Sequence, residues 1–487
     1  MTGAAWQEGD GFGDGPPRPV GALATGPILR TLITFSISTL ISNLLQTVIQ
    51  SIGMIWVGRL LGEQALAATT NGIQLMSLVG TFLMGIAMAT MISIGRHSGA
   101  GDGEGARSAF ACGLGVAIGC GCGLGLGGYL LAGQVLHLLG TPRESMADAI
   151  AYLRVLFLML PAAGLTSTLQ MASRGSGDSR TSLYGTVVTL VVSAGLNPVL
   201  ILGLGGLPKL GVAGAALTAG LANLAGVAAM AALLWRPASP LRLGREHLRL
   251  VLPRGPELRA ILGNGLPISV HMNLVVFAQL VLIGLVNREG LNYTAAFGVS
   301  LQIWTYLQMP SFAISAGITA MAAQAIGAGD HARVGRITRT GMAVSTAMVA
   351  VLIGVILLFI RPILTLFLGP GSPAIALGQH MQAICIWAFI LSSAMSAMTG
   401  TLRAYGAQMV TVAINLVALL GVRLAVYFAT YPLIGADALW WSFIIGIATS
   451  LLLTRIVFVR GPWGKEDANA GPEQPLHPGR ATLSSGQ

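Results

Sequence analysis

Gly99-Ala100-Gly101-Asp102 recurs 228 residues later as Gly327-Ala328-Gly329-Asp330. Three further matches lie at an offset of 228 or 229: Ala67-Ala68 with Ala295-Ala296, Gln74 with Gln302, and Arg174-Gly175-Ser176-Gly177 with Arg403-Ala404-Tyr405-Gly406. Each match lies on a long apolar segment or at its exit. The chain therefore consists of two similar halves, an organisation typical of membrane transporters whose pathway runs between the halves.

The composition predicts an integral membrane protein. Hydrophobic residues make up 54% of the 487 residues and charged residues only 9%, and the mean hydropathy is +0.76. A soluble chain of this length carries more charge. Residues 1–27 are polar and rich in Gly and Pro, without the apolar core of a signal peptide, so we expect a disordered tail there. Residues 461–487 have the same character.

Twelve apolar stretches reach the roughly 20 residues that a membrane-spanning helix requires. They are 30–57, 65–95, 108–136, 149–172, 181–204, 211–235, 260–286, 293–326, 337–360, 374–402, 407–430 and 438–459. Lipid offers no partner to backbone N–H and C=O groups, so each stretch is expected to be helical. The predicted fold is an all-α integral membrane protein with twelve transmembrane helices in two pseudo-symmetric six-helix lobes.

The basic residues predict the orientation. With both termini in the cytoplasm, cytoplasmic segments hold 20 Arg and Lys residues and the opposite side holds 5, as the positive-inside rule requires. The net charge of +10 is then a topology signal, and a nucleic-acid partner is not expected. The linker 236–259 contains six arginines and separates an N-terminal lobe, 28–235, from a C-terminal lobe, 260–460.

Several segments in a fixed order carry a family resemblance. They are Trp56-Val57-Gly58-Arg59-Leu60-Leu61-Gly62 followed by Ala65-Leu66-Ala67-Ala68, Gly99-Ala100-Gly101-Asp102, Arg174-Gly175-Ser176-Gly177-Asp178-Ser179-Arg180, Leu196-Asn197-Pro198, Leu210-Gly211-Val212-Ala213-Gly214-Ala215-Ala216 and Gly265-Leu266-Pro267. Together they resemble the multidrug and toxic compound extrusion (MATE) family of secondary transporters over residues 28–460. The resemblance implies a V of two lobes, alternating access, and export driven by a proton or sodium gradient across the inner membrane.

The chain departs from this family in its acidic residues. Family members often carry an Asp near the end of the first helix and a Glu in the seventh, which are the usual candidates for binding the coupling cation or a cationic drug. Gly53 and Val275 occupy those positions, and none of the 17 acidic residues falls inside a predicted span. An ion near the bilayer centre costs from ~3 to over 10 kcal/mol. A cation site here would have to rely on carbonyl and amide groups.

Two ionisable residues remain at depth. His271 lies near the middle of its span and has a side chain that titrates near neutrality. We interpret it either as the carrier of a coupling proton, preferred over sodium, or as a neutral imidazole hydrogen-bonded between helices. Arg423 either bonds to carbonyls or snorkels to the membrane surface, or it lines the cavity and favours anionic or neutral substrates.

Uncharged polar side chains lie at comparable depths and are candidates for the substrate and ion pathway: Asn43, Gln46, Gln74, Asn197, Asn273 and Gln302. Hydrogen bonds between helices also explain any one of them. Gln74 and Gln302 are equivalent in the repeat, so we expect both near a cavity between the lobes. Tyr306 would share a helix face with Gln302 and supply an aromatic wall. Candidate hinges are Pro161, Pro267 and Pro310.

These observations favour a secondary antiporter that exports drugs or metabolites. The alternative is a flippase of the same superfamily for a lipid-linked or anionic metabolite, which Arg423 favours and the count of twelve spans disfavours. An enzyme is not expected, since no catalytic set of residues is present, and a sensor would normally carry a soluble output domain. Cys112, Cys120, Cys122 and Cys385 lie in apolar segments and are interpreted as packing residues. We expect no cofactor or metal, and a monomer suffices for this architecture.

Overall fold

The computed structural model describes residues 22–138, 146–204, 209–237, 239–244 and 255–461. The N-terminal half contains α1 (Ala22–Thr25), α2 (Ile28–Leu61), α3 (Glu63–Gly99), α4 (Gly103–Leu138), α5 (Met146–Leu158), α6 (Leu160–Gly175), α7 (Ser179–Leu202) and α8 (Gly211–Leu234). The C-terminal half contains α9 (Gly255–Val286), α10 (Leu291–Gly327), α11 (His331–Leu368), α12 (Ala374–Cys385), α13 (Ala388–Ala404), α14 (Gln408–Asn415), α15 (Arg423–Ile434) and α16 (Asp437–Arg460). A 3₁₀ turn, Asn287–Glu289, follows α9, and a π-helix, Leu416–Val422, joins α14 to α15.

The predicted all-α membrane fold is confirmed. Within the residues that the structure describes, ten helical segments are long and apolar enough to span a membrane, and the number rises to twelve when each of two bent helix pairs is taken as one span. The pairs α5–α6 and α12–α13 each bend by 46°. α6 begins at Leu160 and α13 begins 228 residues later at Ala388, so the two bends are equivalent in the repeat.

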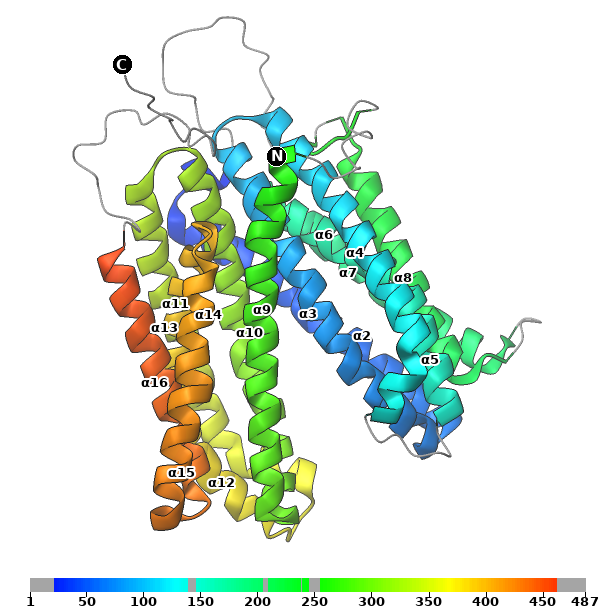
Figure 1. The fold of residues 1–487 in the computed structure, drawn as a ribbon, viewed down its shortest axis with the longest axis vertical. Coiled ribbons are helices and arrows are strands. Elements are labelled where there is room, and N and C mark those ends of the chain that lie inside the picture. Colours follow the sequence, from blue (N-terminus) through cyan, green and yellow to red (C-terminus); the bar gives the residue numbers. More distant parts are fainter. Residues whose placement is uncertain (1–21, 139–145, 205–208, 238, 245–254, 462–487) are drawn as a thin grey trace, which may run out of the picture.

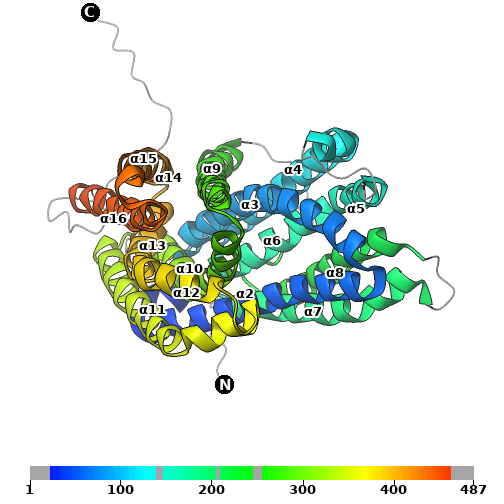
Figure 2. The same cartoon turned by 90° about the horizontal axis from the view of Figure 1, so that it is seen from below.

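The two halves form separate lobes arranged as a V (Figure 1). Helices α3 and α10 end at the upper side of this view, where the lobes meet, and the helices diverge toward the lower side. We call these two sides the closed end and the open end. Seen from below, α2 runs along one face of the molecule from the C-terminal lobe to α7 and α8 (Figure 2). Its Leu32 lies close to Gly317 of α10 and Gly341 of α11.

The hydrophobic core is continuous across the closed end. One cluster of buried side chains combines Ile86 and Met91 of α3 with Ile318 and Met321 of α10. Ala320, Ala322 and Ala323 are fully buried in the same cluster, and small side chains of this kind let helices approach closely. A second cluster, around Trp304 and Trp440, belongs to the C-terminal lobe alone.

Two expected boundaries differ from the structure. Residues 22–27 were expected to belong to a disordered tail, but α1 forms there, with Leu23 only 3% exposed. The Arg333 guanidinium donates to the carbonyls of Leu23 and Gly26, which fixes this turn against the C-terminal lobe. α9 begins at Gly255, five residues before the expected start of the span at residue 260. Residues 1–21 and 462–487, the rest of the two tails, lie outside the described residues, as do 245–254 of the linker.

Candidate functional site

The repeated Gly-Ala-Gly-Asp motif ends one helix and starts the next in both lobes. Gly101 and Gly329 have φ of 75° and 74°, a conformation that glycine adopts without strain and that ends a helix. Asp102 accepts a hydrogen bond from Gly105 N–H at 2.7 Å, and Asp330 accepts one from Arg333 N–H at 2.8 Å. Each aspartate therefore caps the following helix.

The first glycine of each motif packs against the opposite lobe. A Cβ atom added to Gly99 would overlap the backbone of Gln324, and one added to Gly327 would overlap the backbone of Arg96. Gln324 is the repeat equivalent of Arg96, so the two contacts are reciprocal. Gly95 and its equivalent, Ala323, also face each other. The closed end is therefore organised around a pseudo-twofold axis between α3 and α10.

Hydrogen bonds follow the same symmetry. Arg96 of α3 donates to the carbonyl of Ala404 at 2.6 Å through Nη2 and at 3.2 Å through Nε. Gln324 of α10 donates to the carbonyl of Gly175 at 2.9 Å. Each side chain thus reaches the last residue of the bent helix pair in the other lobe, which ties α3 to α13 and α10 to α6.

The contact between the lobes extends from the closed end to about the middle of α3. Ser269 of α9 donates to the carbonyl of Phe82 at 2.7 Å, next to Gly85, where an added Cβ would overlap Ser269. Thr81 donates to Asn273 Oδ1 at 3.1 Å. We call the contact of residues 81–99 of α3 with α9, α10 and α13 the seam. Beyond it the helices of the two lobes diverge (Figure 1).

His271 bonds within its own lobe. Its Nε2 atom is 2.6 Å from Asn415 Nδ2, and Asn415 Oδ1 accepts a hydrogen bond from Ser450 at 2.8 Å. Because the amide nitrogen donates, Nε2 is the acceptor and the ring is neutral, with its proton on Nδ1. Nδ1 is buried without a hydrogen-bond partner among the described residues. A proton on Nε2 would require the Asn415 amide to turn, so that Oδ1 accepts from the imidazole and Nδ2 donates to Ser450 Oγ.

Arg423 is the second ionisable group that the sequence places at depth in this lobe, and it begins α15 directly after the π-helix. Its side chain is 7% exposed, and its guanidinium carbon lies 5.0 Å from the centre of the Phe443 ring, a cation–π contact. Nη2 is buried without a hydrogen-bond partner among the described residues. Gly446 of α16 packs against the Arg423 side chain, with an added Cβ at 3.4 Å from its Cβ.

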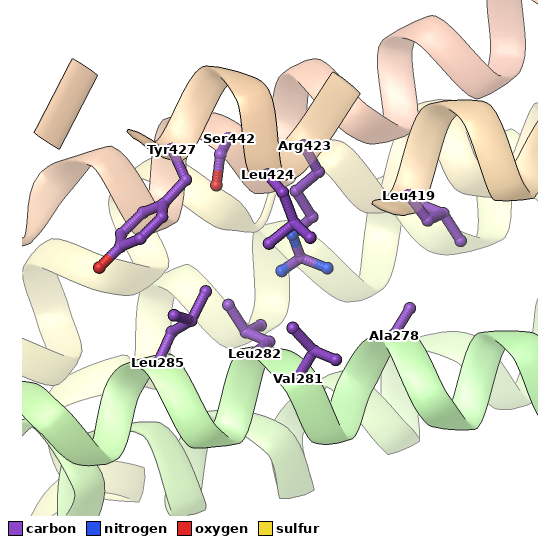
Figure 3. A pocket seen from close by; sticks show the side chains of 9 residues that line it. All are labelled: Ala278, Val281, Leu282, Leu285, Leu419, Arg423, Leu424, Tyr427 and Ser442. Carbon is purple, nitrogen blue, oxygen red and sulfur yellow. The ribbon is translucent and has the colours of Figure 1, made fainter. Parts of the chain in front are cut away.

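A small cavity lies beside this guanidinium. Its volume of about 10 Å³ has room for a single water molecule. The wall is apolar on the side of α9, where Ala278, Val281, Leu282 and Leu285 line it. Figure 3 shows the Arg423 side chain pointing from α15 toward this row. An unpaired guanidinium beside a void of this size is a positively charged group without a carboxylate to neutralise it.

The remaining predicted site residues fall into two groups. Three members are buried or half-buried: Asn197 donates to the carbonyl of Ser193 at 2.7 Å in its own helix, Asn273 accepts a hydrogen bond from Thr81 across the seam, and Asn43 is half-buried. The exposed members are Gln46, Gln74, Gln302 and Tyr306. Gln74 and Gln302 lie on α3 and α10, whose other ends form the seam. The assignment of these residues to a pathway stays a prediction.

The three candidate hinges differ in their surroundings. Pro161 occupies the first turn of α6, directly after the 46° bend. Pro267 and Pro310 lie inside the continuous helices α9 and α10. The equivalent bend in the C-terminal lobe lies at Ile386 and Trp387 and has no proline.

Sequence reasoning missed the residues that hold the closed end together. Arg96 and Gln324 are equivalent at the repeat offset of 228 and precede the glycine motif by three residues. Extending the alignment of the two halves by three positions would have found them. Within the described residues, no group of three His, Cys, Asp or Glu side chains is placed to hold a metal ion, and the four cysteines are free thiols.

Comparison with known proteins gives a consistent picture. The MatE family model matches residues 39–199 and 267–428, two segments that start 228 residues apart. The chain is 32% identical over 428 residues to the probable multidrug resistance protein YoeA of Bacillus subtilis, covering 88% of this chain and 92% of that protein. It is 26% identical over 331 residues to the probable multidrug resistance protein NorM of Thermotoga maritima, covering 66% and 69%.

Two solved structures show the same fold. One, described as the outward-facing conformation of a multidrug resistance MATE family transporter, superimposes with a TM-score of 0.82 at 20% identity, covering 92% of this chain and 99% of that one. The other is a transporter of the MOP superfamily from Pyrococcus furiosus that is described as having a reverse polarity of its binding pocket. It has a TM-score of 0.82 at 20% identity and covers 91% and 97%.

Proposed function

Because the chain belongs to the MatE family of multidrug and toxic compound extrusion transporters, we propose that it exports small organic molecules by alternating access of its two lobes, in exchange for protons. The observation that carries this proposal is the seam. Backbone-to-backbone packing at Gly99 and Gly327 closes one end, while the lobes diverge at the other (Figure 1). Two lobes that touch at one end only can rock about the contact and expose a central site to either side.

We assign the closed end to the cytoplasm, so this conformation faces outward. The sequence assigns 20 Arg and Lys residues to the cytoplasmic segments and 5 to the opposite side. Those of the 20 that the structure describes, Arg96, Arg107 and Arg333 among them, lie in the segments at the closed end (Figure 1), as the positive-inside rule expects for the cytoplasmic side. The location that fits is the inner membrane with both termini in the cytoplasm. One chain supplies both lobes, so a monomer is the proposed functional unit.

We further propose that His271 carries the coupling proton. In this outward-facing conformation its ring is neutral, because Asn415 donates to Nε2. Protonation at Nε2 reverses the chain of hydrogen bonds from α9 through Asn415 to Ser450 of α16, because the amide must turn to accept from the ring and then donates to Ser450 Oγ. A proton arriving from outside would thereby rearrange the contact of three helices beside the π-helix, which is a segment where helices commonly deform.

The charge of the C-terminal lobe favours neutral or anionic substrates over cations. Arg423 is buried, and no acidic residue lies within the twelve predicted spans to compensate it. Moving a cationic drug past an unpaired guanidinium is unfavourable at low dielectric. The names of the relatives refer to multidrug resistance, and they do not favour the flippase alternative.

The test is transport by the purified chain in proteoliposomes with an imposed proton or sodium gradient. Three fluorescent compounds of similar size, one cationic, one neutral and one anionic, are compared. We expect transport of the neutral or anionic compound that a proton gradient drives and a sodium gradient does not. Transport of the cation alone would contradict the role given to Arg423, and dependence on sodium would contradict the role of His271.

A further inference from the structure

One imidazole connects the two lobes at the closed end. His97 of α3 has Nδ1 at 2.8 Å from Asp102 and Nε2 at 3.2 Å from Glu257. Ser93 donates to the other oxygen of Glu257 at 3.2 Å. Asp102 follows α3 in the N-terminal lobe, whereas Glu257 lies in the first turn of α9, in the C-terminal lobe. His97 is therefore placed between a carboxylate of its own lobe and a carboxylate of the other.

This arrangement requires a proton. A neutral imidazole has one N–H donor and one acceptor nitrogen, and an ionised carboxylate only accepts. A neutral ring between two ionised carboxylates would satisfy one contact and leave the second with two acceptors facing each other. An imidazolium donates to both. The group of His97, Asp102 and Glu257 makes both contacts as hydrogen bonds only when it holds one additional proton.

Only one of the two contacts depends on the seam. His97 and Asp102 are five residues apart in one helix–turn unit, so their contact persists whichever way the lobes lean. Glu257 moves with the other lobe, and its contact with His97 is lost when the lobes part at this end. Proton affinity and closure are therefore linked, and by reciprocity the bound proton favours the closed seam.

Two of the surrounding charged groups are engaged elsewhere. Arg96 donates to the carbonyl of Ala404, and Arg107 pairs with Glu104 at 3.2 Å. Other titratable groups on the cytoplasmic halves of the elements around the seam include Cys112 of α4, Arg174 of α6, Arg259 of α9, and Arg403 and Tyr405 at the end of α13. Among the described residues, the carboxylates in hydrogen-bond contact with His97 are Asp102 and Glu257.

We propose that His97, Asp102 and Glu257 form a proton-binding site that latches the cytoplasmic end of the transporter shut. The ligand is a cytoplasmic proton, because the side chains of the three residues are 30%, 47% and 22% exposed at the closed end. The proposal rests on the outward-facing assignment under the proposed function. The site slows proton entry, because the cytoplasmic end of an antiporter that admits a proton in each cycle is held closed when the cytoplasm is already acidic.

The experiment measures conformation without transport. The full chain, with its four native cysteines replaced, is spin-labelled at Leu204→Cys and Leu433→Cys, which are exposed positions at the open ends of α7 and α15. It is placed in nanodiscs, where no gradient exists, and the distance between the labels is measured from about pH 5.5 to about pH 8.5, the range in which histidine titrates. We expect the ratio of the long to the short distance to fall about threefold to tenfold as the pH rises.

Two variants and one control identify the group that causes the pH dependence of the distance. Glu257→Gln and His97→Gln are expected to lose the pH response. His331→Gln keeps it, because His331 bonds to Tyr405 within one lobe, at 2.9 Å. A wild-type distance that does not change with pH, or a response that survives in Glu257→Gln, would overturn the proposal. A normal pH response together with failed transport would count against the proposed function and leave the latch intact.

Discussion

Replacing Gly99 with Ala should shift the transporter away from its outward-facing conformation. The added methyl group would overlap the backbone of Gln324, and no rotamer change relieves a clash with backbone. The lobes must therefore separate at the closed end. Overpacking of this kind costs about 1–3 kcal/mol, which corresponds to a change of about 5- to 150-fold in the ratio of the two conformations. The gain in helix propensity on replacing glycine applies to both conformations and cancels.

The assay is the distance between spin labels at Leu204→Cys and Leu433→Cys, at constant pH. Gly80→Ala is the matched control, because Gly80 lies in the same helix and an added Cβ there meets no atom within 4 Å. Gly327→Ala should act like Gly99→Ala, since the two contacts are reciprocal. The reasoning is refuted if Gly99→Ala keeps the wild-type distance distribution, or if Gly80→Ala shifts it equally.

Three further outcomes are expected. Arg423→Met should reduce transport of an anionic compound at least tenfold, while Arg423→Lys should retain part of the transport. If the two variants transport the compound equally in the proteoliposome assay, the positive charge at position 423 plays no part in the mechanism. His271→Gln should abolish the response of transport to the proton gradient, and full pH-driven transport would show that another group carries the proton. Asp102→Ala should lower the free energy of unfolding by about 0.5–2 kcal/mol at neutral pH, because Asp102 caps α4. Although burial raises the pKa of Asp102, the Gly105 N–H and His97 lower it below its usual value. The stabilisation is therefore fully present above the pKa that Asp102 has in the unfolded chain, and it is lost as the pH falls through the lower pKa of Asp102 in the folded protein. Thermal unfolding of the wild type and the variant in detergent, at neutral and at acid pH, measures this loss of stability. If the difference in stability between the two proteins does not shrink at acid pH, the ionised Asp102 side chain does not stabilise α4.

The fold could be predicted from the sequence because bilayer thickness and the repeat restrict it strongly. Hydropathy determines the spans, and the motif at Gly99 and Gly327 relates one half to the other. The bend at Pro161 could be anticipated from the proline, but the equivalent bend at Trp387 could not, because no local residue breaks the helix there.

For the candidate site, the sequence predicted individual residues but not the contacts between them. His271 and Asn415 are 144 positions apart, and nothing in the sequence pairs them. Glu257 lay in the expected linker, three residues outside the predicted span, so its contact with His97 depended on the first turn of α9. Asn197 shows the opposite limit, since its side chain bonds to its own helix and the alternative of a structural role describes it well.

The reciprocal contact of Gly99 and Gly327 has the form of an interface between two copies of one protein in a symmetric dimer, where each patch meets its own counterpart. A six-helix ancestor that carried one Gly-Ala-Gly-Asp turn would already have possessed both surfaces needed to pair with itself. Fusion of two such units would preserve that pairing and free each copy to diverge. The unlike partners Arg96 and Gln324, which still reach equivalent carbonyls, are the trace of that divergence.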